Sequence, residues 1–144
     1  MKIRTLEASD LQALARLYYQ FWGEESALNA MERKFRVLQK NQAYILLCAE
    51  ENGQLAGSVM GVVCDELYGD CMPFLVVENM IVDQSQRKKG VGRLLFKELE
   101  RRAMAQGCTQ VILVTDESRA DARAFYESMG FHPTKNKGYK KKLL

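Results

Sequence analysis

The stretch VDQSQRKKGVGRLLFKELERR, residues 82–102, joins a basic loop to a helical pattern. Three basic residues, 87–89, stand directly before Gly90 and Gly92. The start of a helix carries unpaired backbone amides and a partial positive charge, and glycine removes the Cβ atom that would hold an anion away from those amides. The pattern therefore predicts an anion site at a helix N-terminus, and it favours a pyrophosphate site over a simple turn.

The residues that follow predict an amphipathic helix of about 15 residues, which Gly107 ends. Other nucleotide motifs fit this loop poorly. The dinucleotide fingerprint requires a third glycine where this chain has Leu95, and the Walker pattern is absent. A nucleotide-binding domain that uses residues 87–93 for ATP or NAD is therefore kept only as a weaker alternative.

Length and composition indicate an ordinary globular protein. The chain has 144 residues, 47% of them apolar and 27% charged, which suits one domain over residues 1–144. A net charge of +3 is too small to indicate nucleic-acid binding. No apolar run approaches the roughly 18 residues of a membrane span, and no signal peptide is visible. We therefore expect a cytoplasmic protein that binds neither nucleic acid nor membrane.

Cysteine and histidine give no support for a metal site. The four cysteines form no CxxC pair, and His132 is the only histidine. We expect no metal cofactor and reduced thiols in the cytoplasm.

The order of predicted elements is strand, two helices, three strands, helix, strand, helix and strand, which indicates a mixed α/β domain. Asn52-Gly53 is the strongest hairpin signal. Ser9 is the expected N-cap of the first helix. The expected strands lie at 2–7, in two runs within 43–67, and at 73–83, 108–115 and 131–144, and the other helices at 8–23, 29–41 and 118–130.

Two segments of the chain resemble the conserved motifs of the GNAT superfamily of N-acetyltransferases. RKKGVG, residues 87–92, resembles the signature R/Q-x-x-G-x-G/A, and ARAFYESMGF, residues 122–131, is similar to A-x-x-(F/L)-Y-x-x-x-G-F. Their order and spacing agree with the family over essentially the whole chain. The resemblance implies a central mixed sheet flanked by helices, in which two parallel strands splay apart to hold acetyl-CoA.

The resemblance also assigns cofactor contacts. Strand residues 80–82 would offer backbone groups to the pantetheine arm, and amides from Lys88 to Arg93 would hold the pyrophosphate. A β-bulge near the end of that strand would leave an amide free for the acetyl carbonyl. Many members have asparagine where this chain has Arg119, which could rearrange the arm or reach a phosphate instead. The candidate cofactor residues are Met80, Ile81, Val82, Arg87, Lys88, Lys89, Gly90, Val91, Gly92, Arg93 and Arg119.

Acetyl transfer to an amine requires proton movement, because an amine of pKa about 10.4 is protonated at neutral pH. Glu78 is the candidate base, and burial on its strand would raise its pKa towards neutrality. Its alternative role is a structural carboxylate. Tyr126, the tyrosine of the second motif, is the candidate acid for the leaving thiolate; its alternative is packing on the sheet.

The resemblance places the acceptor beside the first two helices and the loop after the hairpin. Trp22, Glu25 and Tyr68 are the candidate substrate-binding residues, since aromatic rings and carboxylates suit a cationic amine. A packed helix with solvated acids is the alternative. Val114 replaces the catalytic glutamate that ribosomal-protein acetyltransferases of the family carry, which argues against that subgroup. A homodimer is possible.

These residues predict an N-acetyltransferase that moves an acetyl group from acetyl-CoA to a primary amine on a small cationic molecule or a peptide. No cysteine or serine stands where a covalent acyl intermediate is implied, so direct transfer in a ternary complex is expected. The principal alternative is a non-catalytic acyl-CoA-binding sensor or regulatory subunit.

Overall fold

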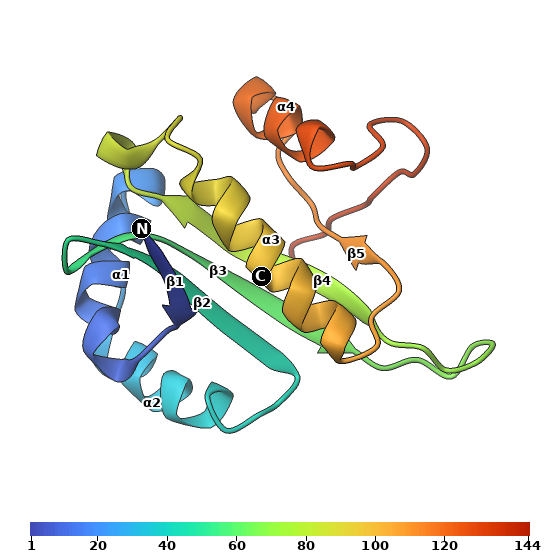
Figure 1. Cartoon of the computed structure of the whole chain (residues 1–144), viewed down its shortest axis with the longest axis horizontal. Coiled ribbons are helices and arrows are strands. Elements are labelled where there is room, and N and C mark those ends of the chain that lie inside the picture. Colours follow the sequence, from blue (N-terminus) through green and yellow to red (C-terminus); the bar gives the residue numbers. More distant parts are fainter. The chain divides into compact units, whose positions relative to one another are not determined.

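The computed structural model describes every residue from Met1 to Leu144, in two compact units, Met1–Ile112 and Leu113–Leu144. The first unit contains all the strands, and the second contains one helix (Figure 1). That residues 1–144 form one domain therefore remains a prediction. The elements are β1 (Lys2–Thr5), the 3-10 turn η1 (Ala8–Asp10), α1 (Leu11–Trp22), α2 (Leu28–Leu38), β2 (Tyr44–Glu51), β3 (Gln54–Cys64), β4 (Phe74–Val82), the 3-10 turn η2 (Gln84–Gln86), α3 (Val91–Ala105), β5 (Val111–Ile112) and α4 (Ala120–Ser128).

The sheet is mixed, as the sequence predicted, with the strand order β1-β2-β3-β4-β5. The first four strands pair antiparallel, and β4 pairs parallel with β5. The parallel pairing joins only Leu75 to Val111 and Val76 to Ile112, while β4 continues to Val82. Beyond Val76, β4 has no parallel ladder, because β5 ends at Ile112.

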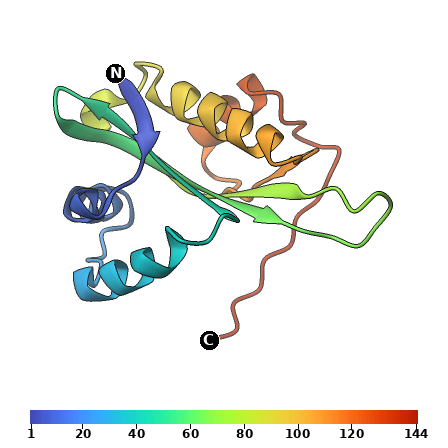
Figure 2. The ribbon, with the colours of Figure 1, turned by 60° about the horizontal axis from the view of Figure 1, so that its bottom comes forward.

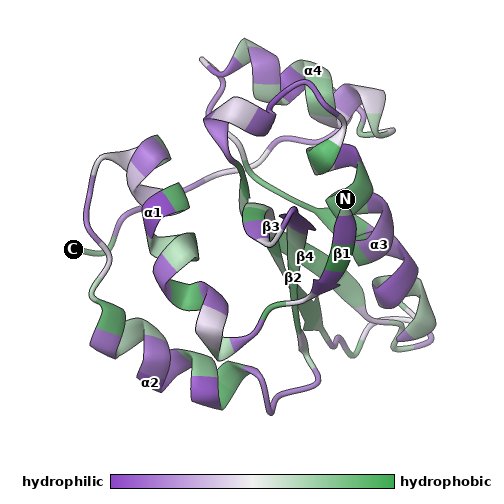
Figure 3. Ribbon diagram, turned by 60° about the vertical axis from the view of Figure 1, so that its left-hand side comes forward, coloured by the Kyte–Doolittle hydropathy of each residue, from purple (hydrophilic) through white to green (hydrophobic).

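Helices cover both faces of this sheet in the first unit. Figure 2 shows α3 on one face and α1 with α2 on the other. Buried Leu95 and Leu99 of α3 pack against the first face, where Gly61 leaves room for Leu99. On the second face, Leu14 and Phe35 lie in one buried cluster with residues of β2 and β4. Figure 3 shows hydrophobic and hydrophilic residues on both α1 and α2, as in helices that bury one side.

The start of α1 differs from the prediction. Ser9 is not its N-cap, because η1 precedes the helix and Asp10 takes the capping position. The Asp10 carboxylate accepts hydrogen bonds from the Glu7 backbone N–H at 2.8 Å and from both terminal nitrogens of Arg4 at 2.7 and 2.9 Å. Arg4 also donates to Glu50 at 2.8 Å, so one guanidinium ties β1, β2 and α1 together.

The end of the chain also differs from the prediction. No strand forms within residues 131–144, and β5 is much shorter than the predicted 108–115. Residues 131–144 therefore form no strand ladder, which a strand requires for its backbone hydrogen bonds. Local contacts replace a ladder there: His132 Nδ1 accepts from the Lys135 backbone N–H at 3.0 Å, and the Lys137 ammonium lies 5.5 Å from the Tyr139 ring centre.

No helix of the chain combines the length and the hydrophobicity that crossing a bilayer requires.

The Arg4–Asp10 ion pair leads us to predict how the free energy of unfolding changes at acid pH. The Arg4 hydrogen bonds hold the pKa of Asp10 below its ordinary value of 3.8. The folded form therefore gains stability from ionised Asp10 above about pH 4 and loses it as the pH falls through the lowered pKa. We expect Asp10→Asn to cost about 1.5–3 kcal/mol at pH 7, because it removes a charge-assisted pair.

Urea unfolding at pH 7 and at pH 3 tests this expectation. The difference between wild type and Asp10→Asn should shrink at pH 3. An equal difference at both values would show that the carboxylate charge contributes nothing.

Candidate active site

A β-bulge interrupts β4 at Asn79 and Met80. The pairing with β3 joins Met60 to Glu78 and then Ser58 to Ile81, so β4 holds one extra residue at this point. Asn79 adopts the left-handed conformation, with φ of 51°. The predicted bulge near the end of this strand is thus confirmed, and the backbone of Asn79 and Met80 lies outside the β3–β4 register.

The bulge determines which way the neighbouring side chains point. Leu75 faces α3, since an added Cβ on Gly61 would meet both Leu75 and Leu99. Side chains alternate along a strand, so Glu78 points to the opposite face, where α1 lies. The extra residue then returns Ile81 to that same face, where it joins the buried cluster of α1 and α2. Glu78 and α1 therefore share one side of the sheet.

Glu78 is exposed, so the expected burial of this carboxylate is wrong. The adjoining Val77 is buried, but it faces α3. The exposure of Glu78 shows that no element of the first unit covers this side chain on the face where α1 lies. Glu78 directly precedes the bulge in β4.

The loop after β4 has the geometry of an anion site. Lys88 and Gly90 adopt left-handed conformations, with φ of 62° and 83°, and α3 begins at Val91. The amides of Val91 and Gly92 belong to the first turn of α3, where an α-helix provides no backbone acceptor. A Cβ added to Gly90 would meet no atom within 4 Å, so the space at this turn is open.

Core packing holds this loop in place. The Val91 side chain is buried and lies 3.3 Å from the Cβ position of Gly57 on β3. Ile81 is buried as well, so Ile81 and Val91 can offer a ligand only their backbone groups. Arg87, Lys88 and Lys89 are exposed and add positive charge at the mouth of the loop.

Two of the predicted residues lie in the second unit. Arg119 is the N-cap residue of α4 and accepts the Arg123 backbone N–H at 3.0 Å. The Tyr126 ring stands edge-on to Phe125 at 5.2 Å and to Phe131 at 5.8 Å between ring centres. These ring contacts lie within the second unit and leave both the acid role of Tyr126 and its alternative, packing on the sheet, as predictions.

The three predicted acceptor residues do not form one cluster. Trp22 is the last residue of α1 and Glu25 lies just after the helix, and both are exposed. Tyr68 lies in the loop between β3 and β4, which projects past the sheet (Figures 1 and 2), and it is 85% exposed. The loop that holds Tyr68 joins β4 at Phe74. Helix α1 contacts the segment after Val82, at the other end of β4. The two ends of β4 lie roughly 26 Å apart, at about 3.3 Å per residue.

A polar contact that the sequence did not indicate joins α1 to the segment after β4. The Gln20 side chain donates to Asp83 Oδ2 at 3.0 Å and accepts the Gln84 backbone N–H at 3.2 Å. Asp83 also accepts from the backbone and the hydroxyl of Ser85, and these bonds together hold the pKa of Asp83 below its ordinary value. No local pattern predicts a partner 63 residues away.

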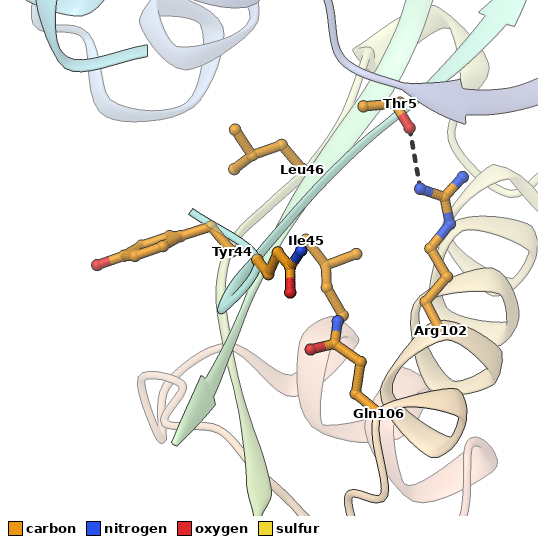
Figure 4. A pocket seen from close by; sticks show the side chains of 7 residues that line it. Thr5, Tyr44, Ile45, Leu46, Arg102 and Gln106 are labelled. Carbon is orange, nitrogen blue, oxygen red and sulfur yellow. Dashed lines mark hydrogen bonds between the residues drawn. The ribbon is translucent and has the colours of Figure 1, made fainter. Parts of the chain in front are cut away.

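A separate hollow of about 410 Å³ opens at the other edge of the sheet, between β1, β2 and the end of α3 (Figure 4). Arg102 donates to the Thr5 hydroxyl there at 2.9 Å and to Glu98 at 2.8 Å. The hollow contains none of the predicted site residues. Its lining residues are Thr5, Gln42, Tyr44, Ile45, Leu46, Arg102 and Gln106.

No three His, Cys, Asp or Glu side chains are grouped so that they could hold a metal ion.

A sequence model of the Acetyltransferase (GNAT) family matches residues 9–131. The chain belongs to this family. The match contains both the bulged strand and the basic loop, so the geometry described above is that of a GNAT acetyltransferase. The chain is accordingly an acyltransferase.

Relatives and solved structures agree with this assignment. The chain is 27% identical over 140 residues to the uncharacterized N-acetyltransferase YhfO of Bacillus subtilis (strain 168), covering 91% of this chain and 89% of the relative. It is 27% identical over 134 residues to a glucosamine 6-phosphate N-acetyltransferase of Trypanosoma brucei brucei, covering 91% and 88%. A putative acetyltransferase from Agrobacterium tumefaciens has the same fold, with a TM-score of 0.89 at 23% identity, covering 99% of this chain and 100% of that one.

The β3–β4 pairing at the bulge makes a prediction about stability. A Cβ added to Gly57 would lie 2.8 Å from the Ile81 backbone carbonyl, and one added to Gly61 would lie 2.6 Å from a methyl of Leu99. A backbone atom can shift less to relieve a close contact than the end of a flexible side chain can. We expect Gly57→Ala to cost about 1–3 kcal/mol of unfolding free energy and Gly61→Ala to cost less.

Urea unfolding of both variants measures this difference. A larger loss for Gly61→Ala would show that the β4 backbone after the bulge is free to move.

Proposed function

We propose that this GNAT protein transfers an acetyl group from acetyl-CoA to a primary amine by direct transfer in a complex that holds both substrates. The observation that carries the proposal is the continuous segment from Glu78 to Gly92: an exposed carboxylate, a bulge and an open helix start in succession. Relatives named for glucosamine 6-phosphate and for the alanine of ribosomal protein bS18 support an amine acceptor.

The residues of the loop fit acetyl-CoA. GNAT acetyltransferases generally use this cosubstrate, which supplies an acetyl group already activated as a thioester. Gly90 leaves open space where a side chain would stand, and the amides of Val91 and Gly92 suit the pyrophosphate. The bulge backbone at Asn79 and Met80 is the proposed donor to the acetyl oxygen, where negative charge develops during transfer.

Proton transfer is assigned to Glu78 and Tyr126. Glu78 takes the proton that the attacking amine nitrogen must lose, either directly or through one water. As the new C–N bond forms and the C–S bond breaks, Tyr126 gives a proton to the departing sulfur. The role of Tyr126 rests on the family resemblance of its motif.

Two cysteines, Cys48 and Cys108, are poorly suited to a covalent route. A covalent route needs a nucleophilic thiolate. Burial raises the pKa of the Cys48 thiol to about 12, and burial also raises the pKa of Cys108. Both thiols are therefore protonated at neutral pH.

The acceptor is proposed to be a small cationic amine or a peptide amine. Trp22 and Glu25, on the side of the sheet to which Glu78 points, offer an aromatic ring and a carboxylate to such a cation.

Replacing the proposed base tests the function. Thiol release from acetyl-CoA should be followed with polyamines, aminoglycosides, amino acids, amino sugars and a lysine peptide, and products identified by mass. We expect turnover on one class, and a fall of about 10²–10⁴ in kcat for Glu78→Gln, because general base catalysis is lost. Glu32→Gln, an exposed carboxylate on α2, is the matched control.

Each outcome has a distinct meaning. Unchanged turnover in Glu78→Gln would keep the enzyme and remove Glu78 as the base. Binding of coenzyme A without turnover on any amine would favour the non-catalytic sensor.

The open turn at Gly90 gives a further prediction. Gly90→Ala puts a Cβ at the proposed pyrophosphate position and adds the strain of a left-handed alanine, about 1–2 kcal/mol. Gly53→Ala in the β2–β3 turn carries comparable strain, with φ of 76°, and no ligand. We expect both variants to lose similar stability, and only Gly90→Ala to bind coenzyme A at least about tenfold more weakly by calorimetry. Equal affinities would remove this loop from the cofactor site.

A further inference from the structure

Gln20 links the last turn of α1 to the segment that enters the basic loop. Its side-chain nitrogen donates to Asp83 Oδ2 at 3.0 Å, and its side-chain oxygen accepts the Gln84 backbone N–H at 3.2 Å. The Gln84 side chain in turn donates to the Gln20 backbone carbonyl at 3.3 Å. We call these three hydrogen bonds the Gln20 bridge.

One end of the bridge is anchored at the start of the cofactor loop. The Asp83 backbone N–H donates to the Ala56 carbonyl of β3 at 2.9 Å. Its Oδ1 accepts from the Ser85 N–H at 2.8 Å and from the Ser85 hydroxyl at 2.6 Å, which fixes the 3-10 turn η2. That turn leads directly to Arg87, so Asp83 sets the direction in which the chain enters the loop.

The other end lies beside the aromatic residues of α1. Trp22, two positions after Gln20, stands edge-on to Phe21 at 4.8 Å and to Tyr18 at 5.4 Å between ring centres. Trp22 is 50% exposed, and Glu25 follows it on the same segment. These are the residues that the proposed function assigns to the acceptor.

We propose that Gln20 is a positioning residue that couples cofactor binding at residues 87–93 to the placement of Trp22 on the acceptor side. The inference rests on the proposed function, because it takes this loop as the coenzyme A site. A ligand held by residues 87–93 restrains the largely exposed turn η2 and, with it, the Asp83 and Gln84 groups that meet Gln20, and the bridge passes that restraint to the last turn of α1. The coupling is reciprocal, so an ordered acceptor side favours the bound form of the loop.

The Gln20 bridge positions the last turn of α1 and adds little to the stability of the fold. Helix α1 is already anchored by buried Leu14 and Leu17, and Gly23 ends it with a backbone bond to Tyr19. The hydrogen bonds of Gln20 are exposed to water, where such bonds add little to stability. Removing them should therefore leave the folded protein intact.

The single tryptophan of the chain provides a readout that needs neither acceptor nor turnover. Coenzyme A is titrated into the full chain while Trp22 fluorescence is recorded, and calorimetry measures affinity on the same samples. We expect a saturable fluorescence change in wild type. In Gln20→Ala we expect that change to fall below roughly half, while affinity stays within about threefold. Gln12→Ala, an exposed glutamine on the same helix, should behave as wild type.

A swapped pair separates positioning from a general effect of mutation. Gln20→Glu places a second carboxylate against Asp83 and removes the donor, so the fluorescence change should be lost. Adding Asp83→Asn restores one donor between the two residues in the reverse direction, and the asparagine oxygen can still accept from Ser85. We expect the double variant to recover most of the wild-type change.

The results separate the two proposals. If wild type does not bind coenzyme A, the proposed function fails and this inference fails with it. If coenzyme A binds but Trp22 fluorescence does not respond, or Gln20→Ala keeps the full response, only the coupling is overturned. Failure of the double variant to recover the response would also overturn it.

Discussion

One extra residue in β4 is the constraint on which the rest of the site depends. Without the bulge at Asn79 and Met80, strict alternation would turn Ile81 towards α3 and away from the α1 cluster. With it, β4 keeps Val77 in one core and Ile81 in the other. The left-handed backbone of Asn79 is locally strained, and this strain accompanies a strand that supplies buried side chains to both faces of the sheet. Glu78 directly precedes the bulge, after which the alternation of β4 side chains between the two faces of the sheet is reversed.

The parallel ladder beside β4 ends before the bulge begins. Parallel pairing with β5 ends at Val76, two positions before Glu78. The bulge follows and then the start of α3, so the segment from Val77 to Gly92 combines backbone groups outside the β3–β4 register at Asn79 and Met80 with the first amides of α3. A ligand with a long polar chain and a phosphate end suits such a surface, because backbone amides and carbonyls can pair with it in sequence.

Much of this arrangement could be predicted from the sequence, because it is written in local patterns. Asn52 and Gly53 both adopt positive φ, as the hairpin signal requires, and the glycine loop does open α3. Two predictions were wrong: the strand expected at 131–144 and the burial of Glu78. Neither is determined by a local pattern. Each depends on which other segment lies alongside, and periodicity within a segment carries no such information. The Gln20 bridge is hidden from sequence analysis in the same way.

The buried Val91 side chain has a consequence for how this protein can diversify. Because Val91 packs beneath Gly57, the amides at the start of α3 are oriented by the interior of the protein. The charges at 87–89 lie outside and take no part in that packing. Shape and charge at the loop are thus inherited from separate residues, so the strength of anion attraction can drift over generations while the geometry of capture stays the same.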